Sequence, residues 1–164
     1  MTIYLKNKYT LKVDEFEFKC CIGKNGLSKN KIEGDKKTPV GLFQLGHLYL
    51  RKDRIKKPYS KLNKIFIKKN MGWCNDPTNK KKYNKTIKLN KKTRHEKLFR
   101  NDYKYDLFIP IKYNYKNPIP GRGSCIFLHL TKNYKPTAGC IALKKKDFLI
   151  MLKLINKRTK IKIA

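Results

Sequence analysis

Short apolar runs bounded by turn-forming residues are the feature that most limits what this chain can fold into. Apolar and polar side chains tend to alternate over residues 3–5, 11–13 and 16–22, and apolar runs return over 106–114 and 125–130. Runs of this length suit β-strands better than amphipathic helices, which need a longer repeat. We therefore expect a mostly-β fold, with Asn7 and Lys8 in a hairpin turn between the first two strands.

The helical pattern is confined to the end of the chain. Apolar residues at 148, 149, 151, 152, 154 and 155 fit one face of an amphipathic helix, and Asp147 suits its N-terminal end. A last strand is expected over Thr159–Ile163, and a short helix over KTRHEKLFRND at 92–102. The predicted fold class is mostly β, with a C-terminal helix and a few short helices.

The size of the chain predicts one domain over residues 1–164. Its 164 residues, 40% of them hydrophobic, are enough to bury a core, and no internal repeat or linker divides them. No apolar stretch reaches the roughly 18 residues of a membrane span, and no signal peptide is readable at the N-terminus. We expect a monomer without a transmembrane segment.

A formal charge of +31 invites a nucleic-acid interpretation. Most of that charge comes from lysines spread along the whole chain, whereas base and phosphate recognition favours the forked guanidinium of arginine. A bias toward Lys, Asn and Ile, or adhesion to an anionic polymer such as a cell wall, explains the charge equally well. We expect no specific nucleic-acid partner. The alternative, a basic nucleic-acid-binding module, predicts salt-dependent binding that is indifferent to Cys140→Ala.

Five cysteines are present, an odd number without a CxxC pair. This pattern argues against a disulfide framework and against a zinc site, so no metal is expected. Cys20, Cys21 and Cys125 lie in strand-like apolar runs and suit small buried positions. Cys140 differs, because Thr137, Ala138 and Gly139 precede it and a histidine lies eleven residues upstream.

Cys140 and His129 form the candidate catalytic pair, as nucleophile and general acid/base. His129 ends an apolar run, a Lys/Asn/Pro loop follows, and Cys140 begins the next run, so two adjacent strands would bring thiol and imidazole together. A neighbouring imidazole makes a thiol a better nucleophile by taking its proton. The backbone N–H groups of Ala138 and Gly139, with that of Cys140, would form an oxyanion hole.

The same window resembles the signature of the L,D-transpeptidase catalytic-domain family, bacterial enzymes that remodel peptidoglycan. The pieces that resemble a proteobacterial subgroup are, in order, GKNGLSKNKIEGDKKTPVGLFQL, GWCNDP, RHEKLFRNDYKYDLFIPIKYN and NPIPGRGSCIFLHL…PTAGCIAL. Two positions depart from the common form of the family. Ala138 replaces the usual His before Gly-Cys, and Ala142 replaces an Arg that often follows the nucleophile.

The resemblance implies a β-sandwich-like fold with no metal or organic cofactor, acting on peptidoglycan stem peptides in the periplasm or cell envelope. It implies a thioester on Cys140 after loss of the terminal D-Ala from a tetrapeptide stem. The acyl group then passes to an amine, giving a 3→3 cross-link, or to water, as in an L,D-carboxypeptidase. A cysteine peptidase or amidase with another substrate shares every catalytic residue and is the alternative.

Substrate contacts are less determined by the sequence. Arg122 either clamps a stem carboxylate or is a solvated turn residue. Trp73 either walls the cleft or lies in the core. Thr137 matches a signature position, and Glu33 and Asp35 either meet a substrate ammonium or cap turns. His95, beside Glu96 in a basic stretch, is expected at the surface, and His47 has no assigned role.

Overall fold

The computed structural model describes residues 1–164 and contains fifteen strands and one helix. The elements are β1 (Thr2–Asn7), β2 (Thr10–Val13), β3 (Phe16–Cys21), β4 (Leu27–Ser28), β5 (Thr38–Pro39), β6 (Gly41–Gln44), β7 (Leu48–Leu50), β8 (Lys64–Phe66), β9 (Met71–Cys74), β10 (Thr86–Lys88), β11 (His95–Lys97), β12 (Leu107–Pro110), β13 (Phe127–Leu130), β14 (Ile141–Leu143), α1 (Lys145–Leu154) and β15 (Lys160–Ile163). The mostly-β prediction is confirmed.

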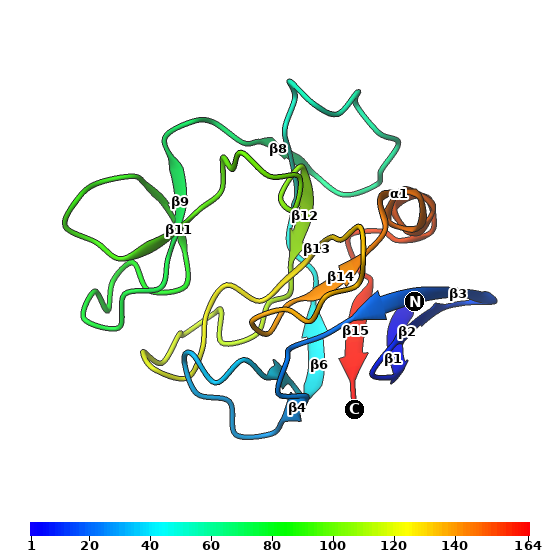
Figure 1. Ribbon diagram of the computed structural model, residues 1–164, viewed down its shortest axis with the longest axis horizontal. Coiled ribbons are helices and arrows are strands. Elements are labelled where there is room, and N and C mark those ends of the chain that lie inside the picture. The colour runs from blue at the N-terminus through cyan, green and yellow to red at the C-terminus, as the bar shows by residue number, and fades with distance from the viewer.

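Ten of the strands form one curled sheet, in the order β6-β15-β1-β2-β3-β14-β13-β12-β7-β8. Figure 1 shows the red strand β15 between the blue N-terminal strands and the cyan strand β6, so the two ends of the chain meet in this sheet. A small sheet, β10-β9-β11, stands apart from it, and β4 pairs with β5. The sheet places β13 and β14 side by side at its centre.

The first three strands follow from the alternation read in the sequence. β1 pairs with β2 and β2 with β3, both antiparallel, and Ile3, Leu11 and Val13 are fully buried. The turn predicted at Asn7 is present, where the Asn7 side chain accepts a hydrogen bond from the Tyr9 N–H at 2.8 Å. The last strand, β15, pairs with β1 in parallel register and confirms the strand expected there.

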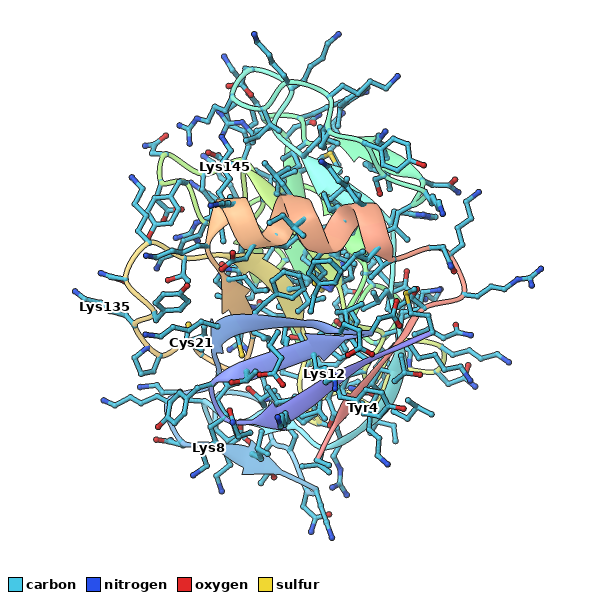
Figure 2. The ribbon with its side chains drawn as sticks, turned by 90° about the vertical axis from the view of Figure 1, so that its right-hand side faces the viewer. Tyr4, Lys8, Lys12, Cys21, Lys135 and Lys145 are labelled. Atoms are coloured by element: carbon cyan, nitrogen blue, oxygen red, sulfur yellow. The ribbon has the colours of Figure 1, made fainter.

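Helix α1 confirms the amphipathic pattern at the end of the chain. Phe148, Met151 and Leu152 are its buried residues, and Asp147 lies in its first turn, where the helix dipole favours a carboxylate. Figure 2 shows α1 crossing the molecule above β1–β3, with Lys145 at its start. At ten residues, it is far shorter than a bilayer is thick, and no helix of the protein qualifies as a membrane span.

The few short helices expected elsewhere were a wrong prediction, since α1 is the only helix. The segment read as helical at 92–102 instead enters strand β11. There His95 lies opposite Cys74 and Glu96 lies opposite Trp73 of β9. Pairing with a strand distant in sequence therefore determines the conformation of this segment, because the hydrogen bonds between the strands outweigh a weak helix propensity.

The buried side chains form two clusters. The larger contains 26 residues between the sheet and α1, among them Phe148 and Met151. The smaller is largely aromatic and includes Trp73, Phe108 and Phe127 together with Cys140. Aromatic rings thus pack around the predicted nucleophile, which ties the position of the thiol to the packing of a core.

We expect Phe148→Ala to lower the free energy of unfolding by about 3–5 kcal/mol, because the fully buried ring leaves a cavity that the sheet cannot close. Urea unfolding followed by fluorescence measures the change. Lys146→Ala, at an exposed position of the same helix, should change stability by less than about 0.5 kcal/mol. Equal effects of the two substitutions would contradict the described packing of α1.

Candidate active site

Parallel pairing of β13 and β14 places Cys140 and His129 on one face of the sheet. His129 lies opposite Ala142, and Leu128 lies opposite Ile141. Side chains alternate along a strand, so Phe127 and His129 share a face with Cys140 and Ala142 of the neighbouring strand. The two adjacent strands expected from the sequence are therefore present, and the thiol and imidazole are diagonal neighbours.

A main-chain carbonyl orients the imidazole. His129 Nδ1 lies 2.9 Å from the carbonyl oxygen of Leu130. Because that oxygen only accepts, Nδ1 carries the proton and donates it, which leaves Nε2 as the basic nitrogen. The Tyr105 ring packs edge-on against the imidazole, with 5.5 Å between the two ring centroids. The Leu130 carbonyl therefore fixes both the tautomer and the orientation of the imidazole.

The sulfur of Cys140 is held by main-chain groups of the strand beside it. The Phe127 N–H donates to Cys140 Sγ at 3.4 Å, and Sγ donates to the carbonyl oxygen of Cys125 at 3.2 Å. No hydrogen bond joins Sγ to His129. Catalytic hydrogen bonds often tighten only when substrate is bound, so the shared face and cleft are the relevant observations.

Cys140 and His129 line one cleft of about 430 Å³. Its walls come from two stretches that flank the pair, one at 96–105 and the other at 133–138. The cleft is lined by Glu96, Arg100, Tyr103, Lys104, Tyr105, His129, Asn133, Lys135, Pro136, Thr137, Ala138, Cys140 and Ala142. Ala142, which lies opposite His129 in the sheet, contributes only a methyl group to this lining.

Burial keeps the Cys140 thiol and the His129 imidazole neutral. Removal from water raises the pKa of the Cys140 thiol to about 12, although the Phe127 N–H opposes this shift. Burial also lowers the pKa of His129 to about 4, against the Leu130 hydrogen bond, and nearby Lys104 adds to the lowering. At neutral pH the pair is therefore thiol and imidazole, and the imidazole is free to accept a proton.

The turn that carries the nucleophile is clamped to the long loop over residues 23–39. The Thr38 hydroxyl donates to the Gly139 carbonyl at 2.9 Å and accepts the Gly23 N–H at 2.9 Å. The Lys24 N–H donates to the Thr137 carbonyl at 2.9 Å. Thr38 is fully buried, and its contacts explain why a long Gly- and Lys-rich loop ends in Thr-Pro.

The oxyanion donors differ from those expected. The Gly139 N–H donates to the Thr137 hydroxyl at 3.1 Å, and that hydroxyl donates to the Cys140 carbonyl at 2.6 Å. Gly139 is therefore not a free donor. The N–H groups of Ala138 and Cys140 make no hydrogen bond in the structure, so these two remain for a developing oxyanion. The Thr137 hydroxyl therefore stabilises the turn between Thr137 and Cys140 through these two hydrogen bonds.

Two glycines of the turn sequences flank a buried lysine. Lys31 is 3% exposed and its ammonium pairs with Asp35 at 2.6 Å. A Cβ added at Gly123 would lie 2.9 Å from the Lys31 chain, and one at Gly139 would lie 2.8 Å from the Lys37 carbonyl oxygen. Gly139 also has φ +137°, which L side chains rarely adopt. Close packing thus accounts for glycine in both GRGS and TAGC.

Two proposed substrate contacts lie elsewhere. Trp73 is 2% exposed and its indole N–H donates to Asn84 Oδ1 at 2.9 Å, so of its two alternatives the structure supports the place in the core. Arg122 is exposed in a turn and does not line the cleft, so a carboxylate clamp there stays a prediction.

Neither acidic residue of the long loop reaches the cleft. Asp35 pairs with Lys31 and accepts the Ile32 and Lys37 N–H groups. Glu33 accepts hydrogen bonds from Ser124, at 2.8 Å, and from Tyr83. These acids fix the loop.

The sequence reasoning missed Tyr105 and Glu96, which do line the cleft. Their stretch shows no periodicity, and only its resemblance to the family marked it. No group of three or more His, Cys, Asp or Glu side chains is placed to hold a metal ion.

Comparison with known proteins gives a family and one fold neighbour. The YkuD family model, described as the L,D-transpeptidase catalytic domain, matches residues 1–163. Among solved structures, the helical cell shape determining protein Pgp2 from Campylobacter jejuni is similar, with a TM-score of 0.51 and 17% identity. The match covers 99% of this chain, which spans about half (46%) of the length of that one. At this sequence identity the similarity shows a shared fold. No curated protein gave a significant match.

Alkylation of Cys140 should report its burial. Because the thiol pKa is raised to about 12, we expect its reaction with iodoacetamide to keep accelerating as the pH rises past about 8.5, the pKa of an ordinary thiol. Peptide mass mapping after timed labelling measures this for Cys140 separately from the other cysteines. A plateau near the ordinary thiol pKa would show that the thiolate is stabilised by a group other than those described.

Thr38→Val should loosen the nucleophile turn, because valine keeps the shape but cannot donate to the Gly139 carbonyl. We expect a loss of about 1–3 kcal/mol in stability and a faster labelling of Cys140 by iodoacetamide, because a looser turn admits water to the buried thiol. Thermal unfolding and the rate of Cys140 labelling measure the two effects. Thr10→Val, remote from the turn on β2, is the matched control and should leave labelling unchanged.

Proposed function

The chain belongs to the L,D-transpeptidase catalytic-domain family, and we propose that it is a cysteine acyl-transferase with Cys140 as nucleophile and His129 as general acid/base. One observation carries the proposal. Of the five cysteines, Cys140 lines the cleft together with the sole histidine found there. Family members act on peptidoglycan peptides, so we propose stem peptides as substrates and the cell envelope as the place of action.

The proposed first step couples proton transfer to attack. Cys140 Sγ attacks the carbonyl at the L-centre of the third residue, meso-diaminopimelate, in a tetrapeptide stem, and the thiol proton passes to His129 Nε2. The coupling follows from burial, since a free thiolate in this cleft is costly while neutral imidazole is available. The Ala138 and Cys140 N–H groups are proposed to stabilise the oxyanion.

Collapse of the tetrahedral intermediate breaks the bond to the terminal D-Ala. The imidazolium returns its proton to the leaving amine, and the acyl group remains on sulfur as a thioester. An amine of a second stem then attacks the thioester, with His129 accepting its proton, and gives a cross-link, proposed as 3→3. Water in the same place gives an L,D-carboxypeptidase. Either outcome alters the cell wall, which supports a proposed role in cell-wall biogenesis and cell shape.

Incubation with purified sacculi, followed by mass analysis of muropeptides, tests the proposal. We expect loss of D-Ala from tetrapeptide stems, or new dimers whose linkage the fragments identify. Cys140→Ser should lower turnover by at least about a thousandfold, because a serine hydroxyl is far less ionised than a thiol.

Cys20→Ala, which removes a buried thiol outside the cleft, is the control and should retain activity. Unchanged muropeptides with the wild-type protein, combined with cleavage of some other peptide or amide, would contradict the proposed substrate. Full activity of Cys140→Ser would contradict the proposed nucleophile.

A further inference from the structure

The active-site cleft holds a single carboxylate among cations. Its charged lining residues are Glu96, Arg100, Lys104 and Lys135. The Arg100 guanidinium is already paired, since it donates to both oxygens of Asp102 and to Glu96. Lys104 and Lys135 are exposed and make no ion pair. A lone acid in the cleft of a protein with a charge of +31 needs an explanation.

The contacts of Glu96 leave half of its carboxylate unused. Oε1 accepts hydrogen bonds from Arg100 Nη1 at 3.0 Å and from the Tyr105 hydroxyl at 3.1 Å. Oε2 has no hydrogen-bond partner, and the side chain is 32% exposed. Two donors on one oxygen fix the position of the group, so the second oxygen is a preorganised acceptor on the cleft wall.

Glu96 is also coupled to the catalytic imidazole. The Tyr105 ring, whose hydroxyl bonds to Glu96, packs edge-on against the His129 ring. The Arg100 guanidinium lies over the same Tyr105 ring at 5.1 Å from its centroid. A ligand held by Glu96 is therefore bound by the wall that supports His129, close to the reacting centre.

The charges on the rim suit the other end of a zwitterion. Lys104 adjoins Tyr105 in the chain, and Lys135 lies on the loop that joins β13 to β14, labelled at the edge of the molecule in Figure 2. Both side chains line the cleft that contains Glu96. One anionic acceptor and two unpaired ammonium groups around a single cleft match a group that carries an ammonium and a carboxylate on one carbon.

We propose that Glu96 Oε2 binds the primary ammonium of a diamino-acid side chain in the acyl-donor stem peptide, with Lys104 and Lys135 available to its carboxylate. This rests on the proposed function. The other acidic candidates are excluded by their contacts, because Glu33 and Asp35 are engaged in the long loop and lie outside the cleft. Selection for a diamino-acid residue therefore falls to Glu96, a residue to which the sequence pattern gave no role.

The test compares two tetrapeptide donors that differ only at this amine, one free and one acetylated. Acylation of Cys140 without any acceptor is followed by intact-protein mass spectrometry. We expect the wild-type protein to be acylated about tenfold faster by the free-amine donor, in line with one charge-assisted hydrogen bond. Glu96→Gln keeps the acceptor for Arg100 and Tyr105 but loses the charge, and should bring the two rates together by slowing only the free-amine donor.

Glu17→Gln is the matched control, because it removes a carboxylate that pairs with Lys6 on the remote strand β3. It should retain the preference of the wild-type protein. An unchanged preference in Glu96→Gln, equal slowing of both donors, or an effect confined to dimer formation would overturn the donor assignment. Acylation by neither donor in the wild-type protein would instead overturn the proposed function, and the Glu96 inference with it.

Discussion

Parallel pairing of β13 with β14 is the contact on which the site depends. It brings the Phe127 N–H to Cys140 Sγ and sets His129 diagonally across from the thiol on the same face. Two chain segments separated by a loop thereby act as one rigid unit, because neighbouring strands constrain both backbone position and side-chain direction. The aromatic cluster that contains Phe127 and Tyr105 packs against the same face of these two strands.

Burial has opposite consequences for the two partners, and together they define the chemistry. It raises the pKa of the thiol and lowers that of the imidazole, so neither group is charged before substrate arrives. The low-polarity site that disfavours a resting thiolate also strengthens the hydrogen bonds offered to an oxyanion by main-chain N–H groups. The packing that holds Cys140 therefore also keeps its thiol protonated.

Local patterns predicted the regular elements well and the irregular ones poorly. The N-terminal meander, α1 and β15 follow from alternation or helical spacing, which depend on neighbours along the chain. The stretch at 92–102 was read as helical, yet it contains β11, whose partner β9 lies twenty residues earlier. The side-chain chemistry of Trp73 and Arg122 is compatible with a substrate contact, but neither residue lines the cleft.

The sequence by itself indicated the candidate pair of Cys140 and His129 and the family, because the order of GRGS, His129 and TAGC can be read without knowing any contact. Only the tertiary structure decided which groups surround that pair. Thr38 and Glu96 reach the site from the short strands β5 and β11, and Tyr105 from a loop. Gly139 is a position of close packing instead of a free donor. Contacts between distant segments depend on how the sheet curls, and that geometry leaves no periodic trace in the residues that form them.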